Sequence, residues 1–395
     1  MAPAPHDPAT QPFDSGPIVR PQVALGLMRP PEQIRAVRRA LILAAAAWVP
    51  LVLLASLQGL ALGPTPRESV LLDPAAYGRY LISLPLLVLA EIVVLPRLSR
   101  IVRHFRESGL VTELDRPRYD VAVERARRLV GHPATDLFLL LLAYASTLAL
   151  TDRTYPADVS TWVFPIGSDG VSRLSWAGWW RTLVSQPLYV LIVAEWLWRL
   201  GVWTWLLFRV GRMRLRIVPS HPDLSGGLRF TATSISAFSL LAFAIGATGA
   251  GNVGRAILID GREPQELAPQ ILALVVASVI LFAGPLLLLV PRLIRAGQDG
   301  AFTYDEVAKS LGKRFEARWL APRGPWDEEA LSAPDFSATT DLYSIVANVR
   351  QMRFFPFDLR TIVFLVGSTL CPFIPLVFAI FPLDELLRML SKVVL

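Results

Sequence analysis

Seven apolar blocks, each about 20 residues long, constrain the fold of this 395-residue chain more than any other feature. About 20 residues of helix cross roughly 30 Å of hydrocarbon. Backbone N–H and C=O groups cannot stay unpaired in lipid, so segments of this length must be helical. The sequence therefore predicts an all-α polytopic transmembrane helix bundle of about seven spans. The blocks cover residues 41–62, 80–96, 134–151, 182–208, 231–249, 269–290 and 361–381.

The seventh block is short and carries Pro372 and Pro375. Proline removes a backbone donor and bends a helix. A re-entrant segment is therefore the alternative to a full span at this position.

Positive charge is distributed unevenly over the loops that join these blocks. One set of loops, together with the N-terminal tail, holds 29 Lys and Arg residues, and the other set holds 9. Loops rich in Lys and Arg stay in the cytoplasm. We therefore expect a multi-pass protein of the bacterial inner membrane with a cytoplasmic N-terminus. The net charge of +7 lies beside the spans, so we expect the lipid bilayer as partner and no nucleic acid.

The blocks and loops divide the chain into four segments. Residues 1–36 contain eight prolines and no hydrophobic period, which predicts a disordered cytoplasmic tail. Residues 37–295 form a six-span bundle with basic cytoplasmic loops. Residues 296–360 form a cytoplasmic loop with amphipathic helices. Residues 361–395 hold the seventh span and a short amphipathic C-terminal helix over 382–395.

The loop 296–360 is predicted to be largely helical. Tyr304, Val307, Leu311, Phe315 and Trp319 recur at spacings of three and four, which is the period of one helical face. Basic residues flank this stripe, so we expect a helix over 304–320 that lies on the inner leaflet or packs beneath the bundle. A second helix is expected over 340–353, and a proline-containing loop over 321–338 separates the two.

Two fragments recur along the chain and suggest a parallel hairpin repeat. The pattern Ser-x-Pro-Leu-x-Val-Leu begins at Ser83 and again at Ser185, and an Ala-Glu pair follows it in both places. Pro-Arg-Leu-x-Arg begins at Pro96 and at Pro291. Hairpins repeated in one orientation would explain these matches, as in some transporters. Chance similarity between apolar spans that end in basic loops is the alternative.

An acid and a base stand near the middle of the fourth block. A charged side chain there costs about 2.5–3.5 kcal/mol on insertion scales, so Glu195 and Arg199 should face the bundle or a water-filled cavity. Their i,i+4 spacing lets them pair on one helical face. The pair is either part of an ion or solute pathway or a self-neutralised pair that fixes helix packing. Glu91, near the end of the second block, we interpret as structural.

The fifth block is rich in small and hydroxylated residues. Thr233, Ser236 and Ser239 fall in it, and Gly246 and Gly249 follow. Small residues let helices approach closely, and hydroxyls can bond between helices. The block is either a tightly packed central helix or a helix that lines a pathway. We expect its hydroxyls to contact the Glu195–Arg199 pair.

Two His-Pro sequences precede spans on the side expected to be cytoplasmic. His132 and Asp136 stand before the third block, and His221 and Asp223 stand before the fifth. Proline favours a turn, and Asp suits a helix N-cap. Both are interpreted as helix-entry signals, with a His/Asp site for a metal or an anion as the alternative.

The string His-Pro-Asp-x-x-Gly-Gly-Leu, which begins at His221, resembles a string in uncharacterised multi-pass bacterial inner-membrane proteins. Phe357-Asp358-Leu359-Arg360 adds a weaker likeness. The resemblance implies a membrane topology and no activity.

The outer loop 152–181 carries four tryptophans, Trp162, Trp176, Trp179 and Trp180. Amphipathic rings settle at the headgroup level, so an interfacial belt is expected, with a sugar- or lipid-binding role as the alternative.

The chain lacks the sequence motifs of a phosphate-binding loop, a zinc helix or a nucleophile elbow. We therefore expect no enzyme, no catalytic residues, no cofactor and no metal site. A channel or secondary transporter for an ion or small solute is slightly favoured. The alternative is a non-transporting scaffold that docks a partner through its cytoplasmic helices. The sequence leaves open a homo-oligomer or a membrane partner.

Overall fold

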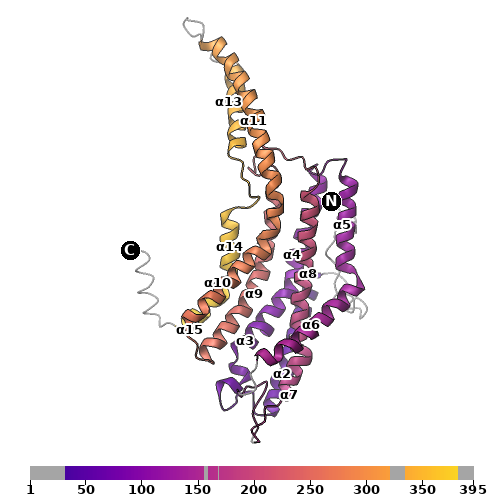
Figure 1. Cartoon of the computed structure of the whole chain (residues 1–395), viewed down its shortest axis with the longest axis vertical. Coiled ribbons are helices and arrows are strands. Elements are labelled where there is room, and N and C mark those ends of the chain that lie inside the picture. Colours follow the sequence, from indigo (N-terminus) through magenta and orange to yellow (C-terminus); the bar gives the residue numbers. More distant parts are fainter. Residues whose placement is uncertain (1–31, 155–158, 168, 321–333, 381–395) are drawn as a thin grey trace, which may run out of the picture.

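The computed structural model describes residues 32–154, 159–167, 169–320 and 334–380 of the chain. All regular structure in this part is helical, and β-strands are absent from it (Figure 1). Six of the helical segments are long and apolar enough to cross a membrane, or seven if α5 (Arg116–Gly131) and α6 (Pro133–Thr154), bent by 48° against each other, form one span. The predicted all-α transmembrane bundle is confirmed.

The long helices given below coincide with the predicted blocks, except α5, which lies in the loop between the second and third blocks. Most of them run along the long axis of the molecule. Two short helices, α3 (Pro74–Ala76) and α7 (Trp176–Trp180), lead into spans. The long helices are α2 (Glu32–Leu57), α4 (Leu84–Glu107), α5 (Arg116–Gly131), α6 (Pro133–Thr154), α8 (Gln186–Gly211), α9 (Thr233–Leu258), α10 (Pro264–Ala283) and α14 (Leu359–Leu370), followed by α15 (Ile374–Ile380).

The seventh block forms one candidate span despite its prolines. A 3₁₀ turn over Cys371–Phe373 joins α14 to α15, and Leu359–Ala379 passes as a single 21-residue span. Pro372 stands at the start of this turn, where its missing N–H costs no helical hydrogen bond. By length and composition this segment is therefore a candidate span, and the re-entrant course stays the alternative.

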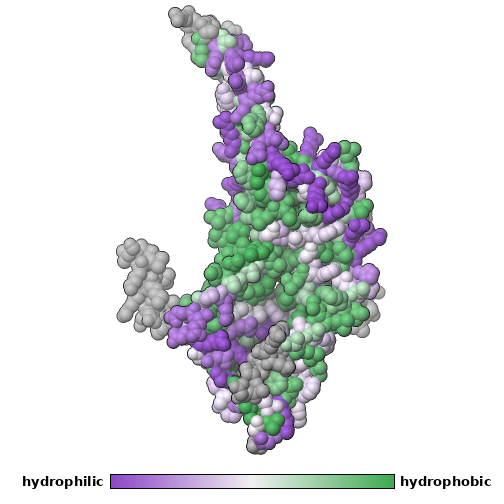
Figure 2. Space-filling model, viewed as in Figure 1, coloured by the Kyte–Doolittle hydropathy of each residue, from purple (hydrophilic) through white to green (hydrophobic). Residues whose placement is uncertain are grey.

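Apolar side chains form a broad band around the middle of the molecule on the face that Figure 2 shows, with polar side chains at both ends. Large apolar side chains stay exposed on the candidate spans, including Phe138, Ile280 and Phe364. Such a band is the surface that lipid covers. We call the end at which α2 begins and α4 and α8 end the basic end, and the other the opposite end.

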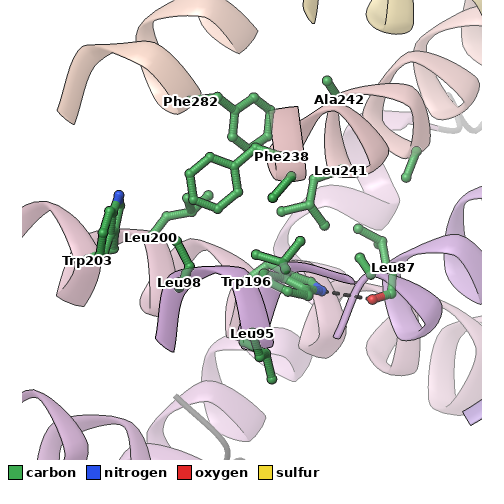
Figure 3. Close-up of a cluster of buried hydrophobic side chains, with 14 of the residues drawn as sticks. Leu87, Leu95, Leu98, Trp196, Leu200, Trp203, Phe238, Leu241, Ala242 and Phe282 are labelled. Carbon is green, nitrogen blue, oxygen red and sulfur yellow. Dashed lines mark hydrogen bonds between the residues drawn. The ribbon is translucent and has the colours of Figure 1, made fainter. Parts of the chain in front are cut away.

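The interior of the bundle is packed with large apolar and aromatic side chains. Trp196 and Trp203 of α8 lie beside Leu98 of α4, and Phe238 of α9 stacks on Phe282 of α10 with 5.5 Å between ring centroids (Figure 3). Trp196 donates its indole N–H to the carbonyl of Leu87 at 2.9 Å. This cluster fills the space between four spans.

Two spans begin with the same local distortion. A π-helical turn covers Tyr77–Ser83 before α4 and Arg181–Ser185 before α8. In both, the residue before the proline donates its backbone N–H to the carbonyl oxygen five residues earlier. Leu84 donates to Arg79, and Gln186 donates to Arg181. The proline that follows lacks an N–H, which favours such a rearrangement. The matching fragments at Ser83 and Ser185 therefore share a backbone conformation. Pro285, in the sixth block, instead lies in a 3₁₀ helix over Gly284–Leu289.

The helix predicted over 304–320 lies elsewhere than expected. It is the continuation of α11 (Val290–Phe315), which extends beyond the basic end and packs against α13 (Pro334–Arg350) (Figure 1). The stripe of Tyr304, Leu311 and Phe315 is half-buried and belongs to this hairpin. We call α11 and α13 together the arm. Periodicity thus identified the half-buried face of this helix. That face belongs to a contact with α13, which is a helix of the same loop.

Three predicted segments lie wholly or mostly outside the described residues. They are the tail 1–36 up to residue 31, the loop 321–338 up to residue 333, and the C-terminal helix 382–395.

The four outer tryptophans divide into two environments. Trp176 and Trp179 are exposed, as an interfacial belt requires. Trp162 is 2% exposed and donates to Asp73 at 2.9 Å, so it belongs to the core of the opposite end. Asp73 also accepts from Arg255 at 3.2 Å. Trp162 is therefore not a belt residue.

Candidate functional site

Glu195 and Arg199 contact each other inside the bundle. The Nη2 atom of Arg199 lies 2.5 Å from Oε1 of Glu195, and their side chains are 2% and 4% exposed. One turn of α8 separates the two residues, which is the spacing that brings such side chains together. The guanidinium also lies 5.1 Å from the centre of the Trp196 ring, where a cation–π contact is favourable.

Two residues from other spans complete a four-membered charge network. Nη1 of Arg199 lies 3.2 Å from Oε1 of Glu91 on α4, and the other oxygen of Glu91 pairs with Arg39 on α2. The network holds two cations and two anions, so its formal charges cancel. A neutral network spread over α2, α4 and α8 fixes these three spans against one another. Glu91 and Arg39 were not expected as partners.

The hydroxyls of α9 do not take part in this network. Thr233 donates to the carbonyl of Phe230 at 2.6 Å, and Ser239 donates to that of Ile235 at 3.3 Å. The expected contact between the fifth span and the Glu195–Arg199 pair is therefore wrong. Hydroxyls in helices often bond to the preceding turn of their own backbone, and these do so.

The basic end holds a cleft, which is the second candidate site. It consists of two adjoining cavities of about 850 Å³ and 420 Å³, which share four lining residues. We call them together the basic cleft. Its walls come from the end of α4, the loop before α9, the start of α9 and the start of α14. The polar lining residues are Arg97, Arg100, His104, Ser108, Arg216, His221, Asp223, Arg229, Thr233, Ser236, Asp358 and Thr361.

The divergence of α4 and α9 produces this cleft. Near the opposite end, the π-helical turn before α4 packs tightly against α9. A Cβ on Gly78 of this turn would lie only 2.5 Å from the carbonyl oxygen of Ala247. At the basic end Phe230 separates them, and its ring contacts those of His104 and Phe105 with centroids 4.3 and 5.0 Å away. Thr233 and Ser236 are exposed to the resulting space.

A tightly ordered loop forms one wall of the basic cleft. Asp223 accepts from the backbone N–H groups of Ser225 at 2.8 Å, Gly227 at 3.0 Å and Arg229 at 3.2 Å. Burial raises the pKa of Asp223, but these three bonds stabilise its carboxylate, so the net pKa lies below the ordinary value. Asp223 thus holds the loop that leads into α9, as a helix-entry signal should.

Backbone strain marks the same loop. Leu224 has a φ of 56°, the only positive value at a non-glycine residue in the described ranges. An L-residue in this region costs about 1–2 kcal/mol. The loop is fixed from the other side of the cleft, since Arg353 donates its N–H to the carbonyl of Leu224 at 2.7 Å.

Asp358 closes the rim where α14 begins. Its carboxylate pairs with Arg229 and with Arg353. These contacts connect the loop before α9 to the segment that joins the arm to α14. Gly297 of α11 lies close to Met352 of that segment, so the base of the arm belongs to the same assembly.

Positive charge exceeds negative charge in the basic cleft. Its lining contains four arginines and two aspartates, and both aspartates are already bonded by protein groups. Among the residues that the structure describes, no carboxylate lies within ion-pair distance of Arg97, Arg100 or Arg216. Three uncompensated guanidinium groups along one cleft, two in the smaller cavity and one in the larger, attract an anion.

The predicted His/Asp residues do not form a common site. His221 and Asp223 line the cleft, with Nδ1 and Oδ1 2.8 Å apart. His132 accepts from the N–H of Ala134 at 3.1 Å at the start of α6, and neither it nor Asp136 lines the cleft. In the described ranges, no group of three or more His, Cys, Asp or Glu side chains could hold a metal ion.

Sequence reasoning overlooked Arg97, Arg100 and His104 as site residues. Their spacing of three and four along α4 places them on one face, and that signal was available. The convergence of this face with Arg216 and Asp358 depends on tertiary packing and left no local pattern.

No family model matches the chain, and no match was found among curated proteins or solved structures. The resemblance to uncharacterised bacterial membrane proteins therefore stays a prediction.

Proposed function

We propose that this integral membrane protein binds a small anion, with a phosphate or carboxylate group, in the basic cleft. Arg97 and Arg100 line the smaller cavity of the cleft and Arg216 lines the larger, and their lack of carboxylate partners among the described residues carries the proposal. Guanidinium groups bind carboxylate and phosphate through paired hydrogen bonds. The exposed hydroxyl of Ser236 offers a further hydrogen-bond donor, and it lines both cavities.

The packing of the bundle supports anion binding without transport better than it supports a channel or a transporter. Channel or transporter activity would need a route from the cleft through the bundle. Along α4 and α9, Leu95 and Phe238 lie deeper in the bundle than the lining residues Arg97 and Ser236, and both belong to the hydrophobic cluster of Figure 3. Glu195 and Arg199 line neither cavity of the cleft, and their charges are met within the network. The polar pair is thus better explained as structural.

Docking of a partner through the arm is a second candidate function. The arm extends away from the bundle and exposes Phe302 at 81% and Tyr343 at 51%. Exposed apolar side chains on a projecting hairpin favour contact with another protein. We also infer that the basic end faces the cytoplasm, because the charge split of 29 to 9 follows the rule for inner-membrane proteins.

Anion binding is tested by titrating the purified full-length protein with inorganic phosphate at constant ionic strength. Saturable thermal stabilisation is expected for the wild type. Arg100→Gln should raise the apparent Kd about tenfold, since a hydrogen bond to a charged group contributes about 1.5–3 kcal/mol.

The matched control is Arg103→Gln. Arg103 stands on the same helix and has the same charge, but it does not line the cleft. Its substitution should leave the phosphate titration unchanged. Equal loss of binding in both variants, or the absence of a saturable effect in the wild type, would contradict the proposal.

A further inference from the structure

We propose that the anion held in the basic cleft is the phosphate of an anionic membrane phospholipid, whose acyl chains lie along α14. This inference rests on the proposed function and names the source of the anion. Its argument is the position of the cleft relative to the apolar band.

The cleft lies where the apolar surface of the bundle ends. On α4, the apolar run ends at Pro96, and Arg97 and Arg100 follow within one turn. On the facing wall, Asp358 precedes α14, and Leu359 directly after it is 78% exposed. An exposed leucine at the first residue of a span indicates that hydrocarbon begins there. The polar lining is therefore level with lipid headgroups.

Two exposed aromatic residues support this depth. Phe354 and Phe355 are 46% and 50% exposed in the short segment before α14. They follow Arg353, whose guanidinium pairs with Asp358 at the rim of the cleft. Large apolar rings exposed beside a basic cavity find cover in the interfacial region of a bilayer, not in water.

One helix connects the cleft to the lipid-facing surface. Asp358 and Thr361 line the cavity, whereas Val363 and Phe364 are each 60% exposed on α14. A lipid with its phosphate beside Arg97 and Arg100 can thus extend its chains along α14. A soluble phosphate compound would gain nothing from this apolar surface.

The dimensions and chemistry of the cleft fit a headgroup. The larger cavity, about 850 Å³, falls in the range of about 300–1,000 Å³ that holds organic ligands and far exceeds a single phosphate. A phosphodiester offers only acceptors in its charged part. Arg97 and Arg100 supply donors in the smaller cavity, Arg216 in the larger, and Ser236 lines both. A polar headgroup beyond the phosphate can bond to the rest of the lining.

The test compares phosphatidylglycerol with phosphatidylcholine of identical chains, added to the delipidated full-length protein and counted by native mass spectrometry. The wild type should prefer phosphatidylglycerol. Arg100→Gln and Arg216→Gln should each reduce that preference about fivefold, the contribution of one basic residue beside anionic lipid. Arg216 is exposed on a loop, so its substitution leaves folding intact. Arg103→Gln should retain the full preference.

Two further outcomes separate this inference from the proposed function. Phe364→Ser should weaken phosphatidylglycerol binding and leave the inorganic phosphate titration unchanged, because the side chain contacts only the acyl chains. If Arg100→Gln abolishes phosphate binding while the lipid preference stays the same, the anion is soluble and the lipid inference is wrong. If neither ligand depends on Arg100, both the inference and the proposed function are wrong.

Discussion

At the scale of single residues, the buried charges differ in how many partners each one has. Arg199 bridges Glu195 and Glu91, whereas Glu195 pairs with Arg199 alone among the described residues. Removal of a charge from a buried pair strands the other member, which commonly costs about 3–5 kcal/mol. The consequence of each substitution therefore depends on the partners that remain.

Arg199→Gln should destabilise the protein more than Glu195→Gln. The first change strands Glu195, whose side chain is 4% exposed, whereas the second leaves Arg199 paired with Glu91. A loss of about 3–5 kcal/mol is expected for Arg199→Gln. The double variant should lose less than the sum of the two, and thermal unfolding in detergent measures all three.

The control for this prediction is an exposed pair with the same spacing. Glu124 and Arg128 lie 2.9 Å apart on α5, with 42% and 76% of their side chains exposed. Glu124→Gln and Arg128→Gln should change stability by less than about 1 kcal/mol. Additive losses in the Glu195 and Arg199 variants would show that the two charges do not depend on each other.

Local spacing predicted one contact of this network and could not predict the rest. Glu195 and Arg199 are four residues apart, so helix geometry alone brings them together. Glu91 lies 108 residues from Arg199 and 52 from Arg39. Contacts over such distances depend on which spans are neighbours, and the period of a single helix does not contain that information.

At the scale of elements, glycines allow α9 to lie close to its neighbours. A Cβ on Gly251 would lie 2.6 Å from the carbonyl oxygen of Pro74, and a Cβ on Gly246 would overlap the carbonyl of Thr369 on α14. These obstacles are backbone atoms, which cannot move aside as a flexible side chain can. The sequence left open a tightly packed central helix or a helix that lines a pathway, and these distances agree with the first.

Gly251→Ala should therefore destabilise the protein by about 1–3 kcal/mol, the usual cost of overpacking. Gly201→Ala is the matched control, because Gly201 lies inside α8 and a Cβ there meets nothing within 4 Å. That change should be neutral or stabilising by up to about 1 kcal/mol, since alanine favours a helix over glycine. Equal unfolding temperatures for both variants would mean that α9 and α3 are not in close contact.

The arm shows the limit of periodicity at this scale. The stripe of Leu311 and Phe315 identified an amphipathic helix, and α13 is the helix that packs against α11. Periodicity measures how apolar a face is. It does not tell whether lipid, the bundle or a second helix covers that face.

At the scale of the whole molecule, the spans alternate in direction between the basic end and the opposite end. The length and composition of the spans were predictable, because the bilayer imposes both. The basic cleft was not, because it arises where four separate elements meet. Orientation remains a proposal based on the charge of the loops.

Topology reporters test that orientation. Fusions after Arg128 and Arg216 should report the cytoplasm, because these residues stand in the basic loops, and fusions at Asp169 and Glu263 should report the periplasm. Alkaline phosphatase and a fluorescent protein, active on opposite sides of the membrane, give complementary signals. A common side for the two pairs would contradict the alternating arrangement, and exchanged sides would reverse the proposed orientation.

The charge network also has a consequence for the insertion of the spans into the membrane during synthesis. Arg39 and Glu91 leave the ribosome in the first two spans, and they form an ion pair with each other. Glu195 and Arg199 emerge later, together on a single helix. Each unit is electrically neutral by itself when it leaves the translocon. The first two spans can thus stay in the bilayer before the fourth span is inserted, because Arg39 and Glu91 already neutralise each other.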